Sequence, residues 1–341
     1  MFESLTANSI LFVVAAIAIG LAGVRLARVT DLIADKTGWG EAIVGALFLG
    51  GSTSLSGVVT SVTAASQGQA ELAVSNALGG IAAQTVFLSI ADLFYSRANL
   101  EHAAASVANL TQGVLLVTLL AIPLMTASSQ SVTLWGVHPA SLFLIVAYGF
   151  GLRLVMKAKT EPMWQARSTD ESYVDEADEA DLKDVSLSSL WLQFIPLVCV
   201  IGLAGYGIAQ AGGAIASQTG LSETVVGAML TAITTSLPEL VTSIAAVRQG
   251  ALTLAVGDII GGNCFDVLFL AVADIAYRDG SIYHAVGQRE IFIVSLAILL
   301  VGILLLGLLR RERHGLGNIG FESFLTIILY IAGFAVLFNM G

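Results

Sequence analysis

The chain has 341 residues, of which 56% are hydrophobic and only 12% are charged, and its mean hydropathy is +0.85. A soluble domain carries about twice that share of charged residues. Composition therefore excludes an ordinary soluble protein, and with it a soluble enzyme, and predicts an all-α integral membrane protein. The formal net charge of −10 gives no reason to expect nucleic acid as a partner.

Apolar runs predict about ten membrane-spanning helices of roughly 20 residues, the length that crosses a hydrocarbon core about 30 Å thick. In chain order they cover residues 7–29, 41–64, 71–96, 106–126, 132–157, 188–215, 221–246, 252–277, 286–309 and 319–340. The first run has no basic segment before it, so we interpret it as a retained helix and not as a signal peptide. With the N-terminus outside, about thirteen of the fifteen Lys and Arg residues fall on the other face. That face is then cytoplasmic, and we expect a multi-pass protein of the cell membrane.

The sequence contains an internal repeat. Residues 20–95 align with residues 202–277 at a constant offset and without a gap, and about 32 of 76 positions are identical. Such a match indicates a duplicated unit. Five spans per unit is an odd number, so the second copy must cross the membrane in the opposite direction. The sequence therefore predicts two inverted five-helix repeats related by a twofold axis in the membrane plane.

One long polar stretch separates the two repeats. Residues 158–187 contain most of the excess acidic residues. A cation-sensing segment is one interpretation, but the spacing lacks the calcium-loop pattern of an EF-hand, and we favour a solvated cytoplasmic loop. The predicted organisation is a first repeat over residues 1–157, the acidic loop, and a second repeat over residues 188–341.

Ionisable residues lie in the middle of two spans of the second repeat. Glu239 follows Thr235, Ser236 and Pro238 in one span, and Asp266 lies in the next. A carboxylate at that depth is costly and marks a functional site by default, although buried acids can also be neutral structural groups. Pro238 removes a backbone hydrogen bond and should break its helix, which frees carbonyl oxygens beside the hydroxyls. These oxygens predict a site for a hard cation, with Glu239 and Asp266 as metal ligands.

The segments T-S-L-P-E-L-V-T-S at residues 235–243 and G-D-I-I-G-G-N-C-F-D at residues 257–266 resemble the alpha-repeat of the cation/calcium antiporter superfamily. That superfamily includes sodium/calcium and calcium/proton exchangers, and its signature is G-T-S-L-P-E plus G-N-x-x-G-S-N in each half. The resemblance covers nearly the whole chain. It implies a midplane ion site built from the second, third, seventh and eighth spans. The implied cation-binding residues are Thr53, Ser54, Thr235, Ser236, Glu239, Asn263 and Asp266, together with Gln84, the repeat equivalent of Asp266.

The first repeat departs from this signature. Ser56 stands at the equivalent of Pro238, and Gly57 at the equivalent of Glu239, so both the helix breaker and one carboxylate are missing. Glycines and an isoleucine also replace signature serines and an asparagine, at Gly80, Gly262 and Ile81. We expect Gly57 to leave open space and one missing charge, and the site to bind Ca²⁺ more weakly than a site with two facing glutamates.

Asp92 and Asp274 are repeat equivalents near the ends of their spans. Asp92 lies eight residues beyond Gln84, about 12 Å along a helix, which is too far to replace the missing carboxylate. We interpret both residues as interfacial or capping acids.

Two functions fit the sequence. The first is a secondary antiporter that moves Ca²⁺ or another small cation in exchange for Na⁺ or H⁺ by alternating access. The second is a transport-inactive sensor or scaffold that keeps the exchanger fold. Paired acids in hydrocarbon favour transport, and Gly57 keeps the alternative open. No cofactor is expected besides the transported ions. The expected partners are small inorganic cations and the lipid bilayer, and the pattern specifies no oligomeric state.

Overall fold

The structure is a computed structural model that describes residues 4–37, 50–95, 98–167, 169, 186–313, 315 and 320–340. The described residues form helices and connecting turns, with a single isolated bridge between Leu134 and Val137. The first half contains α1 (Leu5–Thr37), α3 (Leu55–Ser66), α4 (Ala70–Asp92), α5 (Leu100–Ala103), α6 (Val107–Ala127) and α7 (Pro139–Thr160). The second half contains α8 (Leu187–Thr219), α9 (Glu223–Val225), the π-helix η2 (Val226–Thr231), α10 (Ala232–Thr235), α11 (Leu237–Gln249), α12 (Leu252–Asp266), α13 (Leu268–Ala276), the 3₁₀ turn η3 (Ile282–His284), α14 (Gln288–Arg310) and α15 (Phe321–Asn339).

Within the described ranges, eight helices are long and apolar enough to cross a membrane, or nine if the bent pair α9–α10 and α11 forms one span. The all-helical membrane class is therefore confirmed. The expected span 41–64 is described only from residue 50, and α3 is too short to count as a span by itself. The expected acidic loop falls between α7 and α8, and residues 168 and 170–185 of it lie outside the described residues. The ten-span count and the division into two repeats stay predictions.

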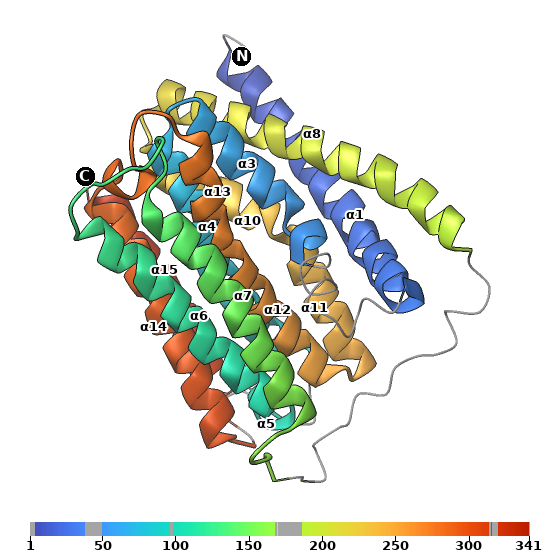
Figure 1. Cartoon of the computed structure of the whole chain (residues 1–341). Helices are drawn as coiled ribbons and strands as arrows, with labels where there is room; N and C mark the ends of the chain where they lie inside the picture. Colours follow the sequence, from blue (N-terminus) through green and yellow to red (C-terminus); the bar gives the residue numbers. More distant parts are fainter. Residues whose placement is uncertain are drawn as a thin grey trace.

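The two longest helices, α1 and α8, have 33 residues each and pack against one another along one side of the molecule (Figure 1). A helix of that length extends for about 50 Å, more than the hydrocarbon thickness, so it must tilt or project from the membrane. Both helices also contact the shorter, interrupted helices. A Cβ atom on Gly23 of α1 would lie 2.3 Å from Pro238 Cγ, and one on Gly205 of α8 would lie 2.8 Å from the carbonyl oxygen of Ser56. Glycine at these two equivalent positions permits that close approach.

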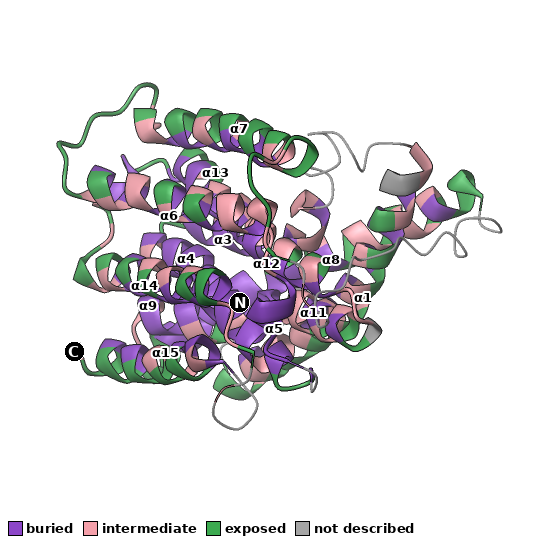
Figure 2. Ribbon diagram, turned by 90° about the horizontal axis from the view of Figure 1, so that it is seen from below, coloured by how far each residue is buried: buried purple, intermediate pink, exposed green. Residues whose placement is uncertain are grey.

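Helix α4 lies at the centre of the bundle (Figure 2). Of the residues in its most apolar 18-residue stretch, 94% are buried. Its sequence is rich in Ala, Gly and Ser, and small residues let neighbouring backbones come close. A Cβ atom on Gly79 would lie 2.5 Å from the Cα atom of Ala228 in η2. Gln84 therefore projects from a helix that is surrounded by others, which fixes the position of its side chain.

Asp92 and Asp274 have matching hydrogen bonds at opposite ends of the bundle. Asp92 accepts from the backbone N–H groups of Leu100 (2.7 Å) and Gly320 (3.3 Å). Asp274 accepts from the equivalent N–H groups of Ile282 (2.9 Å) and His138 (2.7 Å), and from the hydroxyl of Ser141. Both acids thus tie a turn of their own half to a helix start of the other half. The interpretation of both residues as capping acids is confirmed.

Candidate cation site

The site begins where the second-half span breaks. The helical segment Glu223–Thr235, which ends with α10, meets α11 at an angle of 46°, and Ser236 lies at the junction with φ −99° and ψ 9°. Pro238 lies in the first turn of α11, where its missing N–H costs nothing to the new helix. The predicted break at Pro238 is confirmed. It places Glu239 in the first turn of α11, next to the end of α10.

The first half is interrupted at the equivalent residue, although it has no proline. Ser54 has φ −87° and ψ 8°, and α3 begins directly after it. The N–H of Ser54 donates to Gly50 and its carbonyl accepts from Val58, just as Ser236 bonds to Ala232 and Leu240. The expected span 41–64 is described only from Gly50, and within that part a turn at Ser54 interrupts the helix although the sequence has no proline there. The hydroxyl of Ser56 donates to the carbonyl of Thr235 (3.0 Å), so the two interruptions contact each other.

A small cavity lies between the interruptions, α4 and the α12–α13 span. Six of the eight predicted site residues line it. They are Ser54, Gln84, Thr235, Ser236, Glu239 and Asp266. The other two predicted residues do not line it. The hydroxyl of Thr53 donates to the carbonyl of Gly50 (3.2 Å), and the side-chain amide of Asn263 donates to the hydroxyl of Thr85 (3.4 Å).

Asp266 joins the two halves of the molecule through hydrogen bonds. Its Oδ1 accepts from the hydroxyl of Ser54 (2.6 Å), and its Oδ2 accepts from the amide of Gln84 (2.7 Å). The same amide of Gln84 lies 3.2 Å from the hydroxyl of Ser236, to which it also donates. Asp266 is thus held by one donor from the start of α3 and one from α4.

Glu239 is different, because its buried Oε2 atom has no hydrogen-bond donor among the described residues. The Oε1 atom of Gln84, another residue that lines the cavity, is also buried and has no donor among the described residues. Leaving a buried acceptor without a donor costs about 1–3 kcal/mol, and more when the acceptor is charged. Both atoms are acceptors, so the groups that can satisfy them are a cation or a proton and not an anion.

Asn76 also lines the cavity, and sequence reasoning missed it. Its amide donates to the carbonyl of Gly57 (3.2 Å), and its Oδ1 accepts from the hydroxyls of Thr231 (2.8 Å) and Thr235 (3.5 Å). The signal was present, because Asn76 occupies the second position of the G-N-x-x-G-S-N signature. Asn76 fixes Thr235 and the backbone of Gly57 beside the cavity.

The expectation that Gly57 leaves open space is wrong. A Cβ atom on Gly57 would lie 2.6 Å from Cε2 of Phe269, whose ring also lines the cavity. Phe269 is buried, and it makes an edge contact with Phe265. An aromatic ring thus occupies the place where a first-half glutamate would project. The missing charge is real, but it is matched by a change in packing that sequence comparison of the repeats alone did not reveal.

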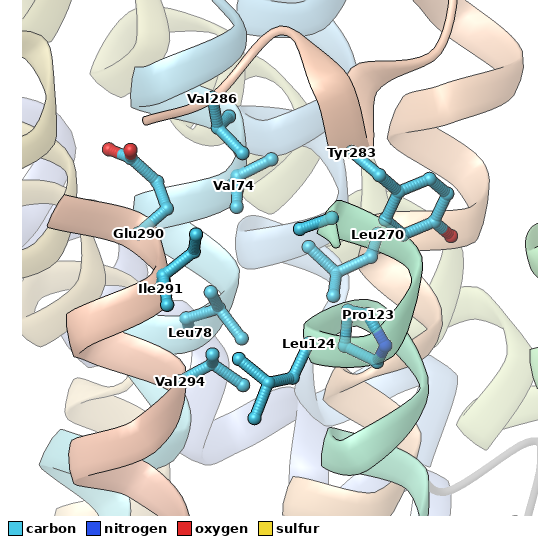
Figure 3. A pocket seen from close by; sticks show the side chains of 11 residues that line it. Val74, Leu78, Pro123, Leu124, Leu270, Tyr283, Val286, Glu290, Ile291 and Val294 are labelled. Carbon is cyan, nitrogen blue, oxygen red and sulfur yellow. The ribbon is translucent and has the colours of Figure 1, made fainter. Parts of the chain in front are cut away.

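Within the described ranges, no three His, Cys, Asp or Glu residues gather in a geometry that could hold a metal ion. The cavity thus provides two carboxylates, hydroxyls and amides. A second cavity lies between α4, α6, α13 and α14, and its lining is almost entirely hydrocarbon (Figure 3). Glu290 borders it, but the carboxylate points away, toward donors from Ser75, Thr224 and Gly287. That apolar cavity has no chemistry for an ion.

The sodium/calcium exchanger protein family matches residues 8–156 and 189–339. The chain belongs to this family. The putative antiporter CaxA of Alkalimonas amylolytica is 28% identical over 294 residues, which are 83% of this chain and 85% of CaxA. Among solved structures, the H⁺/Ca²⁺ exchanger CAX matches with a TM-score of 0.70 at 14% identity, over 98% of this chain and 85% of CAX. The sodium-calcium exchanger NCX_Mj matches with a TM-score of 0.61 at 17% identity, over 97% of this chain and 99% of NCX_Mj.

These matches confirm the resemblance to the cation/calcium antiporter superfamily. The protein is a multi-pass membrane protein of a transporter family, and its relatives support cation antiport in general. The likenesses to CAX and NCX_Mj, at under one fifth identity, show the shared fold alone.

Proposed function

We propose that this protein is a secondary cation antiporter that moves Ca²⁺ or another small cation in exchange for Na⁺ or H⁺ at the cavity between Glu239 and Asp266. The observation that carries the proposal is a pair of buried acceptor atoms without donors, Glu239 Oε2 and Gln84 Oε1, on two residues that line one cavity. A bound cation satisfies both atoms and the charge of the carboxylates.

The charges of the site suggest the exchange. The two carboxylates carry two negative charges when both are ionised, which one divalent cation or two monovalent cations neutralise. A fully occupied site is then electrically neutral with either load, and a buried neutral site is the form that can move between the two sides of a low-dielectric membrane.

Alternating access requires that each side of the cavity can open. The interruptions at Ser54 and Ser236 lie at the cavity, and α1 and α8 pack on the two interrupted helices through Gly23 and Gly205. Two inverted repeats that rock about a fixed midplane site are the usual way to build such a transporter. We propose that the α1–α8 pair moves as a unit along this contact.

The distribution of Lys and Arg supports a cell-membrane location with the N-terminus outside. In that orientation α5 and the α7–α8 connection are cytoplasmic.

The test is ion flux in vesicles that contain the purified protein, with Ca²⁺ on one side and either a Na⁺ or a pH gradient across the membrane. We expect Ca²⁺ movement that depends on one of these gradients. Glu239→Gln removes charge with little change of shape, so flux should fall to background while the protein still folds. Glu312→Gln is the matched control, because Glu312 pairs with Arg310 in a partly exposed site and should not affect flux.

If the wild type shows no flux of Ca²⁺, Mg²⁺, Mn²⁺, Na⁺ or K⁺ under any of these gradients, the result would favour the transport-inactive sensor or scaffold. Near-normal flux in Glu239→Gln would place the transport site elsewhere.

A further inference from the structure

A second set of buried acids lies at the end of the bundle where α4, α5 and α15 meet. Asp92, Glu101 and Glu322 are at most 1% exposed. Asp92 is the last residue of α4, Glu101 belongs to α5, and Glu322 belongs to the first turn of α15. This cluster is remote from the transport cavity, since Asp92 lies eight residues beyond Gln84 on α4, about 12 Å away.

The opposite end of the molecule shows that the backbone hydrogen bonds made by Asp92 do not require Glu101 or Glu322. Asp274 repeats the backbone hydrogen bonds of Asp92, and Ser141 stands at the equivalent of Ser323. However, the equivalents of Glu101 and Glu322 there are Tyr283 and Ala140. The hydroxyl of Tyr283 bonds to Ser141 (2.9 Å). One end therefore has two buried carboxyl groups that the shared architecture does not require.

Glu101 and Glu322 are poorly supplied with donors. Oε1 of Glu101 accepts from the hydroxyl of Ser323 (3.2 Å), but its Oε2 has no donor from another described residue. Neither oxygen of Glu322 has a donor from another described residue. Its side chain is enclosed, because a Cβ atom on Gly307 would lie 2.3 Å from its Cγ and one on Gly320 would lie 1.9 Å from its Oε1.

The hydroxyl that donates to Glu101 belongs to Ser323, the residue next to Glu322, so the two buried acids meet where α5 packs on the start of α15. Two carboxylates offer only acceptors, so a hydrogen bond between these side chains requires a proton. Burial raises the pKa of Glu101 well above its usual range, and the negative charges of Asp92 and Glu322 raise it further. Two buried carboxylates in contact cannot both be charged at moderate cost, so one proton is retained.

The other charged groups that the structure describes at this end have their own contacts. The guanidinium of Arg311 donates to the carbonyls of His102 and Arg167, and Arg310 pairs with Glu312. The ring of His102 bonds to the carbonyl of Arg311 and the hydroxyl of Thr169. Asp92 accepts from Leu100 and Gly320. The carbonyl of Arg313 accepts from the N–H of Asn99.

We propose that Glu101 and Glu322 form a proton-binding site that is separate from the transport cavity, and that the shared proton fastens α5 and the start of α15 to the end of α4. When the proton leaves at alkaline pH, the two carboxylates repel and this contact weakens. The site is therefore a pH-sensitive contact at the end of α4, the helix that holds Gln84 in the cavity.

The experiment measures the Tm of the purified full-length protein from mildly acidic to mildly alkaline pH, in buffers free of metal cations. A carboxyl group whose pKa is higher in the folded state stabilises the fold at low pH, and this stabilisation is lost as pH rises to the folded-state pKa. We expect the Tm of the wild type to fall relative to that of Glu101→Gln by on the order of 2 °C for each pH unit in that window. Glu322→Gln should flatten the profile in the same way, and Asp279→Asn, which changes an exposed acid in the turn after α13, should run parallel to the wild type.

An infrared measurement gives a second readout that does not depend on stability. The wild type should show a carboxylic-acid carbonyl band near neutral pH that is reduced in Glu101→Gln and in Glu322→Gln. Unchanged bands in both variants, or pH profiles of Tm that match the wild type, would overturn the proposal. A Ca²⁺-dependent rise in Tm that disappears in Glu101→Gln would show instead that the ligand is a cation. Because none of these readouts requires transport, the outcome is independent of the proposed function.

Discussion

The residues around Ser54 and those around Ser236 have the same backbone conformation but different side chains. Both segments interrupt a helix with nearly the same dihedral angles and the same backbone hydrogen bonds. After Ser236 comes Glu239, with an unsatisfied buried oxygen, whereas after Ser54 comes Gly57, covered by the ring of Phe269. The first interruption thus forms without a proline, while the carboxylate that follows such an interruption is present only in the second half.

The largest loss of cation affinity is expected from removing the charge of Asp266, which residues of both halves contact. Asp266→Asn keeps the shape of the side chain, and rotation of the Gln84 amide can restore one hydrogen bond, so the protein should fold. Loss of one carboxylate from a buried charged site costs about 3–5 kcal/mol, so cation affinity should fall on the order of a hundredfold or more. Flux in vesicles and Tm of the same preparation measure the two quantities. Retained flux would mean that Ser54 and Gln84 position Asp266 for structure alone.

The second prediction restores the missing carboxylate. Gly57→Glu alone should destabilise the protein, because the new side chain meets Phe269 at a distance too short for real atoms. Combined with Phe269→Ala, it gives the site a third acid. The attraction of a carboxylate for Ca²⁺ is twice that for Na⁺ at equal distance, so Ca²⁺ affinity should rise on the order of tenfold and Na⁺ affinity by less.

Phe269→Ala is the matched control for that experiment, since it opens the same space without adding charge. Its Ca²⁺ affinity should remain close to that of the wild type. If Phe269→Ala alone gains as much affinity as the double variant, then access and not charge limits binding, and the site is not deficient in acid.

The smallest effect concerns the contact between the two interruptions. Ser56→Ala removes the hydrogen bond to the carbonyl of Thr235, which should cost about 1 kcal/mol. We expect a decrease in Tm on the order of 2 °C and little change in ion selectivity. Thermal unfolding of the purified variant checks this. A large loss of flux with an unchanged Tm would instead show that the contact controls the conformational change.

Much of the molecule could be predicted from the sequence, for reasons that are local. Membrane spans follow from long apolar runs, and the broken span follows from Pro238. Glu239 and Asp266 could be assigned to one site because charged groups at the membrane centre need partners. Asp92 and Asp274 could be identified as capping acids because both lie near the end of an apolar helix.

The remaining features depend on tertiary contacts. The interruption at Ser54 has no proline to announce it. Phe269 lies 212 residues from Gly57 in the chain, so no spacing rule connects the two. Asn263 matches the signature but bonds to Thr85 beside the cavity, and the contact between Glu101 and Glu322 requires both halves to be folded.

The central claim is that the transported cation lies between Glu239 and Asp266. Its most direct test is a crystal structure of the protein soaked with Sr²⁺ or Mn²⁺, in which anomalous scattering locates the ion. We predict one peak in the cavity lined by Ser54, Gln84, Ser236, Glu239 and Asp266, and its loss in Glu239→Gln. A peak elsewhere within the membrane region that persists in Glu239→Gln would contradict the account.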